Sequence, residues 1–140
     1  MKTLLCSAFL IFSTFCFSQK IDSTIVIGTW QSELDEDNTF GSFIFDKDGF
    51  ITIESQGITM GGANSMAKGK PIQMIYKLDV SKKPMQLDIL VRKPETKTEM
   101  IAMRAIVEFS SDFKMKIAID QEQRPTEFTP ENSMSFSRIK

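Results

Sequence analysis

The sequence predicts an all-β protein, an eight-stranded antiparallel up-and-down (meander) β-barrel, from three observations. Apolar and polar residues alternate with a period of two along most of the chain, which is typical of strands with one buried face. Three short turns each place apolar residues of neighbouring strands opposite one another. Short and long connections alternate, so the long ones gather at one end. Such a sheet buries its apolar face most simply by closing into a barrel.

Composition excludes several classes of function. The 140 residues include 17 Lys and Arg, 18 Asp and Glu, and no histidine. The missing histidine excludes imidazole catalysis and imidazole metal ligands, and the near-neutral charge gives no basic surface for nucleic acid. No motif for a nucleophile, a phosphate or a metal appears, so we expect a non-enzymatic protein without a cofactor or a metal.

The N-terminus has the pattern of a secretory signal peptide. Lys2 precedes an apolar run at 4–17, and Cys16 and Ser18 provide the small residues of a cleavage site after residue 18. The alternative, a transmembrane anchor, needs about 20 apolar residues, which is longer than this run. The sequence therefore predicts cleavage of 1–18, no membrane span afterwards, a single domain at 19–140, and a periplasmic or secreted location. Cleavage also removes both cysteines.

The expected strands, in chain order, are residues 25–34, 41–46, 50–55, 72–80, 85–92, 101–109, 114–120 and 133–139. In each of the strands from 72–80 to 114–120 every second residue is apolar, and at least half of the intervening residues are polar or charged. The shorter outer strands contain the same alternation and are separated by Gly, Asp and Ser.

The first tight turn has the chemistry of a type I turn. Asp46–Gly49 ends in a glycine suited to the left-handed region. This turn sets Phe45 opposite Ile51. It also sets Phe43 opposite Ile53, so all four side chains share one face.

The other two tight turns give the same result. The turn at 81–84 sets Tyr76 opposite Ile89. The turn at 110–112 sets Phe109 opposite Phe113, and Val107 opposite Met115. A slip of one residue would move either strand's apolar side chains to the wrong face. The longer connections are expected at residues 35–40, 56–70, 93–96 and 121–132.

Residues near the predicted first and last strands carry a resemblance to a family. Gly28-Thr29-Trp30 resembles the Gly-x-Trp signature of lipocalins within the calycin group, and segments 124–128 and 135–138 resemble small lipocalin-like domains of bacterial exported proteins. In lipocalins an arginine near the end of the last strand lies across this tryptophan. The resemblance implies that Arg138 covers Trp30 and closes the barrel floor, and both residues fall at the tightly turned end. The alternative is that Arg138 frays at the terminus.

The barrel interior is the expected binding site for a small hydrophobic molecule. Its predicted cavity residues are Phe43, Phe45, Ile53, Met74, Tyr76, Ile89, Met103 and Met115. Flexible methionines suit varied apolar ligands. The alternative is an interior filled by its own side chains. The Tyr76 hydroxyl is expected to bond a ligand or, more commonly, the backbone or a water.

The long loop at 56–70 is expected to form the entrance. Met60, Met66, Lys68 and Lys70 would line it. These features favour a carrier of an apolar or amphipathic ligand. The alternative function is a filled barrel that binds or inhibits a protein partner through its loops. Outward Ile75, Leu90 and Ile106 leave open an apolar surface for dimerisation.

Overall fold

The computed structural model describes residues 21–33, 41–120 and 122–140. The predicted signal peptide and the predicted loop at 35–40 lie outside the described residues. The elements are η1 (Ser23–Val26), β1 (Gly28–Ser32), β2 (Ser42–Phe45), β3 (Ile51–Ser55), β4 (Ile58–Gly61), β5 (Ser65–Ala67), β6 (Lys70–Asp79), β7 (Met85–Lys93), β8 (Thr98–Ser111), β9 (Lys114–Asp120) and β10 (Ser133–Arg138).

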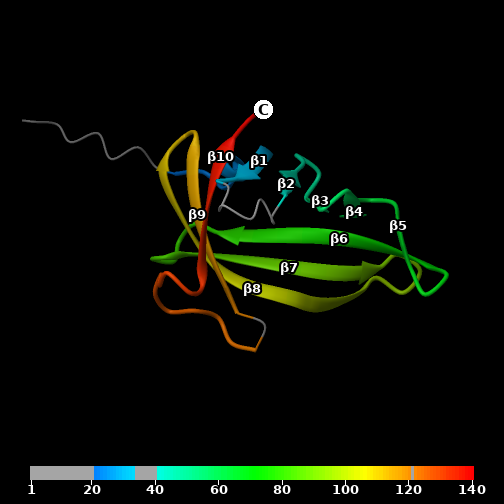
Figure 1. Cartoon of the computed structure of the whole chain (residues 1–140). Coiled ribbons are helices and arrows are strands. Elements are labelled where there is room, and N and C mark those ends of the chain that lie inside the picture. Colours follow the sequence, from blue (N-terminus) through cyan, green and yellow to red (C-terminus); the bar gives the residue numbers. More distant parts are fainter. Residues whose placement is uncertain (1–20, 34–40, 121) are drawn as a thin grey trace, which may run out of the picture.

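The strands form one antiparallel sheet that curls into a nearly closed barrel (Figure 1). Its order is β4-β3-β2-β1-β10-β9-β8-β7-β6-β5, so the first and last strands of the chain are neighbours. The two edges approach each other where Phe50 makes an isolated bridge to Ile75. Beside it, the Met74 amide donates to the Gly62 carbonyl at 3.0 Å. The predicted antiparallel barrel is therefore present, with a seam between β3–β4 and β6.

The sheet has ten strands, and the expectation of eight was wrong. The expected strands correspond to β1–β3 and β6–β10, whereas β4 and β5 lie in the segment predicted to be an entrance loop. Two short turns build them. Gln56 and Gly57 have φ of 51° and 78°, and Lys68 and Gly69 have φ of 51° and 75°. Two successive positive φ angles are typical of type I′ turns, whose twist matches that of a hairpin.

The first expected strand was also too long. Residues Ser23–Val26 form a 3₁₀ helix, and the strand begins only at Gly28. The Asp22 side chain caps this helix by accepting from the Thr24 amide at 3.2 Å. Ile25 and Val26 therefore belong to a short helix and Ile27 is its C-cap, so none of the three is part of β1.

The first and second hairpins have the predicted registers. Phe43 pairs with Ile53, and Phe45 pairs with Ile51. Gly49 has φ of 92°, as the turn requires. In the second hairpin Tyr76 pairs with Ile89, again as predicted.

The third hairpin differs from its predicted register. Phe109 pairs with Met115, and Val107 pairs with Ile117, because β8 continues to Ser111 with an irregularity after Phe109. Phe113 consequently lies in the turn, where it is 65% exposed. The shift is an even number of residues, so the paired side chains of β8 and β9 keep their predicted faces, whereas Phe113 does not.

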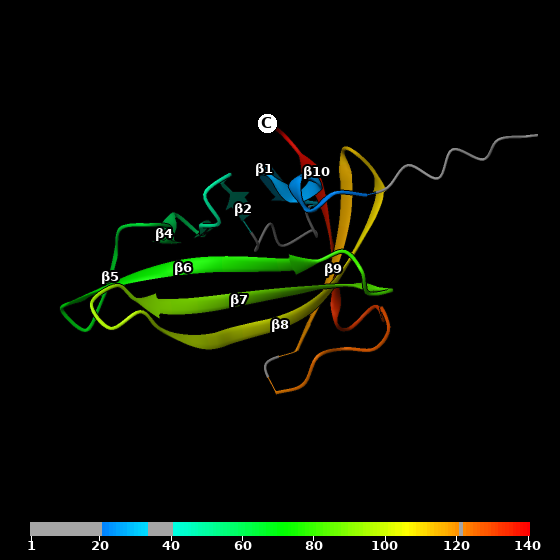
Figure 2. The ribbon, with the colours of Figure 1, turned by 180° about the vertical axis from the view of Figure 1, so that it is seen from behind.

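The outer face of the barrel is partly covered by the chain itself. The segment before β10 lies along the outer side of β8 (Figures 1 and 2), and Arg124 bonds there to the Ala105 carbonyl at 2.9 Å and to Asp88 at 2.6 Å. The outward side chains considered for dimerisation are buried within the single chain: Ile75, Leu90 and Ile106 are 4%, 6% and 2% exposed. They form no exposed apolar surface.

Candidate functional site

The end of the barrel that carries the tight turns is closed by Arg138. Its guanidinium carbon lies 4.3 Å from the centre of the Trp30 ring. The guanidinium also donates to three backbone carbonyls: from Nε to Asp112 at 2.8 Å, and from the two Nη atoms to Ile27 and Ile25. A planar group with five donors can serve all three carbonyls while it stacks on the indole. The contact implied by the lipocalin resemblance is therefore present.

Trp30 and Gly28 explain the Gly-x-Trp pattern physically. Trp30 is fully buried, and its Nε1 donates to the Val26 carbonyl at 2.8 Å, which fastens the 3₁₀ helix over the closed end. Gly28 has φ of 136°, and a Cβ there would lie 2.5 Å from Arg138 Nη1 and 2.5 Å from the Lys140 carbonyl oxygen. Only glycine fits this position without displacing Arg138 or the C-terminus.

The eight predicted cavity residues belong to one inward apolar cluster. The part of this cluster near the closed end is densely packed. Phe43 stacks on Phe136 with centroids 5.1 Å apart, and Phe45 meets Tyr76 edge-on at 5.0 Å. Met115 is also buried there, at 3% exposed. In this half of the barrel the expected lining residues fill the interior with their own side chains.

The Tyr76 hydroxyl bonds the backbone, which is one of the alternatives that the sequence leaves open. Its hydroxyl donates to the Asp46 carbonyl at 2.6 Å and so ties β6 to the first hairpin turn across the seam. Burial, followed by the nearby Asp46 charge, raises the pKa of the Tyr76 hydroxyl. Its proton is therefore engaged with the protein backbone.

The opposite half of the interior is apolar but remains partly exposed. Six side chains there, which we call the mouth residues, face inward by strand pairing: Met60, Val91, Met100, Met103, Ile119 and Met134. Each retains accessible surface, and Met60 and Met100 are 47% and 62% exposed. Among the predicted cavity residues, Met103 lies in this group, and the buried Ile53 and Met74 lie next to it. The mouth residues thus offer apolar surface on the inner face of the barrel.

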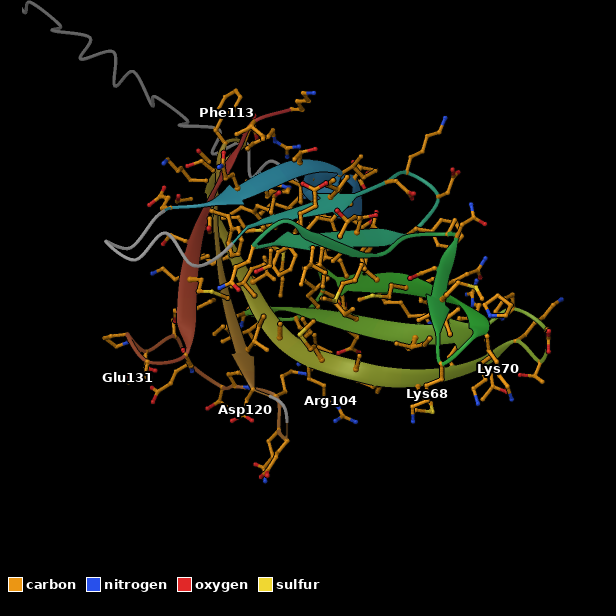
Figure 3. The ribbon with its side chains drawn as sticks, turned by 45° about the vertical axis from the view of Figure 1, so that its right-hand side comes forward. Lys68, Lys70, Arg104, Phe113, Asp120 and Glu131 are labelled. Atoms are coloured by element: carbon orange, nitrogen blue, oxygen red, sulfur yellow. The ribbon has the colours of Figure 1, made fainter. Side chains whose placement is uncertain are left out.

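The predicted entrance residues are spread over two hairpins. Met60 pairs with Ile53 and shares its inward face, whereas Met66 pairs with Pro71 on the opposite face and is 64% exposed. Lys68 and Lys70 are exposed at the turn between β5 and β6, on the side of the molecule away from Phe113 (Figure 3). The structure therefore brings Met60 to the mouth and leaves Met66 on the outer face.

Ser32 is a residue of this interior that the sequence analysis did not single out. It follows Trp30 by two residues on the inward face of β1 and pairs with the fully buried Phe136. It is 6% exposed and is the only polar member of the buried set of described residues. Its Oγ has no hydrogen-bond partner within 21–33, 41–120 or 122–140. The alternation that placed Trp30 inside would also have placed Ser32 there.

A hollow of about 520 Å³ lies beside the closed end. Its lining includes Ile21, Met85, Phe109 and Phe128, with Lys82 and Lys83 in the adjoining turn. It is open to solvent and lies at the end opposite the mouth residues. Any binding experiment must distinguish these two locations.

The described residues contain no group of three Asp or Glu side chains arranged to hold a metal ion. No helix in 21–33, 41–120 or 122–140 is long and apolar enough to cross a membrane.

No protein-family model, curated protein or solved structure matches the chain. The lipocalin resemblance therefore depends on the residues of this chain alone.

Proposed function

We propose that this protein is an exported, lipocalin-like barrel that binds one small apolar or amphipathic molecule and catalyses no reaction. The observation that supports this most strongly is the contrast between the two halves of the interior. Around Trp30 the side chains of Phe43, Phe45 and Phe136 are buried and packed together, whereas the mouth residues face inward and keep accessible apolar surface. A molecule bound there would cover that surface.

The expected affinity comes from apolar burial. Each methylene group that leaves water contributes about 0.8 kcal/mol, before the cost of immobilising the ligand. Four of the six mouth residues are methionines, whose flexible side chains adapt to different ligand shapes. We therefore expect a moderate affinity and a broad preference for apolar chains or rings.

The proposed location rests on the N-terminal segment. The charge at Lys2, the apolar run and the small-residue site are typical of a cleaved signal peptide. We propose that the chain is exported and works in the periplasm or outside the cell.

A protein-binding or inhibitory function is the second candidate. It is favoured by exposed apolar side chains on the strands around the open end: Ile58, Met66 and Met100 are 62%, 64% and 62% exposed. Together with a filled interior, such side chains would suit contact with a partner protein.

A titration with N-phenyl-1-naphthylamine, a neutral apolar dye, tests the first proposal. We expect saturable fluorescence enhancement at micromolar dye. Met100→Lys should weaken the dye affinity about tenfold or more, because it places a charge among the mouth residues. Ile101→Lys is the matched control, since Ile101 is the next residue, is 45% exposed and pairs with the outward Leu90. Absence of saturable binding, or equal effects of both variants, would favour the protein-binding function instead.

A further inference from the structure

We infer that Ser32 is the polar anchor of the ligand site, and that the ligand carries an uncharged hydrogen-bonding group which bonds the Ser32 hydroxyl. This inference rests on the proposed binding function and names the chemistry of its ligand. It concerns a long-chain alcohol, ketone or ester rather than a fatty-acid anion.

The Ser32 hydroxyl is buried and unpaired among the described residues. Ser32 is 6% exposed, and no described group forms a hydrogen bond with its Oγ. A buried polar group without a partner destabilises a protein, and native proteins contain few of them. Alanine would fill the same place in β1 without that cost. Because none of the described residues pairs with this hydroxyl, we assign its partner to the bound ligand.

The position of Ser32 places its hydroxyl between the packed aromatic side chains and the mouth residues. Ser32 is the last residue of β1 and lies two residues from Trp30 in the direction of the open end. Its partner across the strand pair is Phe136, and the next inward residue of β10 is the mouth residue Met134. A ligand that enters along the mouth residues would meet Ser32 where the filled half of the barrel begins. Its polar group would point inward, and its apolar part would lie toward the mouth.

The buried side chains around Ser32 favour an uncharged ligand group. Ser32 is the only polar or charged side chain in the buried set of the described residues, so that set offers no cation to a bound anion. Arg138, the inward-facing cation at the closed end, is occupied by the carbonyls of Ile25, Ile27 and Asp112. A carboxylate beside Ser32 would be desolvated without an opposite charge, which is strongly unfavourable. An alcohol or carbonyl needs only the one hydrogen bond that Ser32 can donate or accept.

Displacement of N-phenyl-1-naphthylamine by three molecules of equal chain length tests the inference. These are 1-dodecanol, ionised dodecanoate and dodecane. For the unaltered protein we expect dodecanol to bind about tenfold more tightly than dodecane, and dodecanoate to bind more weakly than dodecanol. Ser32→Ala should remove the tenfold advantage of dodecanol and leave dodecane unchanged.

Ser135→Ala is the matched control, because Ser135 is an exposed serine that pairs with Lys116 on the outer face of β10. It should change none of the three affinities. If dodecanol keeps its advantage in Ser32→Ala, or if dodecanoate binds most tightly, the inference is wrong while the proposed binding function stands. If neither the dye nor any of the three molecules binds the unaltered protein, the proposed function itself is wrong. A Ser32→Ala protein that fails to fold would also contradict the inference, because the hydroxyl would then already have a partner within the chain.

Discussion

Arg138 combines three roles in one side chain. It stacks on the buried Trp30 ring, donates to two carbonyls beside the 3₁₀ helix, and donates to the Asp112 carbonyl in the turn after β8. It thereby joins the start of the described chain, the third hairpin and the last strand. Gly28 makes room for it.

Arg138→Ala should lower the free energy of unfolding by about 2–4 kcal/mol, because it removes a cation–π contact and leaves three carbonyls without their donors. Denaturant unfolding measures this loss. Arg138→Lys should recover only a small part of it, since a lysine cannot reach three carbonyls in one plane. The dye affinity should stay the same in both variants. Unchanged stability with lost affinity would mean that Arg138 belongs to the binding end.

The sequence predicted this residue pair but missed Ser32. A tryptophan in a Gly-x-Trp pattern and a C-terminal arginine are recognisable by type. The alternation of β1 places Ser32 on the inward face, but the missing hydrogen-bond partner depends on the folded surroundings and cannot be read from the residue type.

At the scale of elements, short turns and one surface cluster fix how the strands meet. Turn chemistry predicted the registers of two hairpins, but it did not predict the strands β4 and β5. Their turns, Gln56-Gly57 and Lys68-Gly69, lack the Asn or Asp that makes a type I′ turn recognisable. The predicted register of the third hairpin was wrong because the Ser-Ser-Asp stretch is not the turn, and Ser111 still pairs with Lys114. In the structure the turn lies one to two residues later, at Asp112 and Phe113.

The surface cluster consists of Glu33, Lys114 and Ser137, and it joins the end of β1 to β9 and β10. The hydrogen bond from Lys114, and then that from Ser137, lower the pKa of the Glu33 carboxyl below its usual 4.5. A carboxyl with a lowered pKa stabilises the fold above its unfolded pKa, and this stabilisation is lost as the pH falls through the folded pKa.

Stability should therefore fall as the pH is lowered from about 6 to about 3, and Glu33→Gln should make that fall smaller. The loss of unfolding free energy should differ between Glu33→Gln and the unaltered protein by well under about 1 kcal/mol, because the Glu33 and Lys114 side chains are both exposed and water screens their ion pair. Urea unfolding at each pH measures it. Glu99 also has a lowered pKa, through Lys77 first and then Arg92, so Glu99→Gln provides a comparison. Identical pH profiles for Glu33→Gln and the unaltered protein would contradict this assignment.

At the scale of the whole molecule, Arg138 closes one end of the barrel over a packed aromatic core, and the other end has accessible apolar side chains. The period-two alternation predicted the all-β fold and its inward face, because residue parity is a local property. It did not predict which inward side chains pack tightly and which stay accessible, because packing depends on how side chains from many strands meet. Phe43 and Phe136, for example, are far apart in the sequence and stack at 5.1 Å.

The methionine methyl groups provide the most direct test of the central claim, that an apolar molecule binds at the open half. Met103 and Met134 are mouth residues, Met115 is buried in the filled half, and Met85 lines the hollow beside the closed end. In a methyl NMR titration with N-phenyl-1-naphthylamine, we predict saturable shifts at Met103 and Met134, with Met85 and Met115 unchanged. Shifts confined to Met85, or no saturable shift at any methionine, would contradict the account.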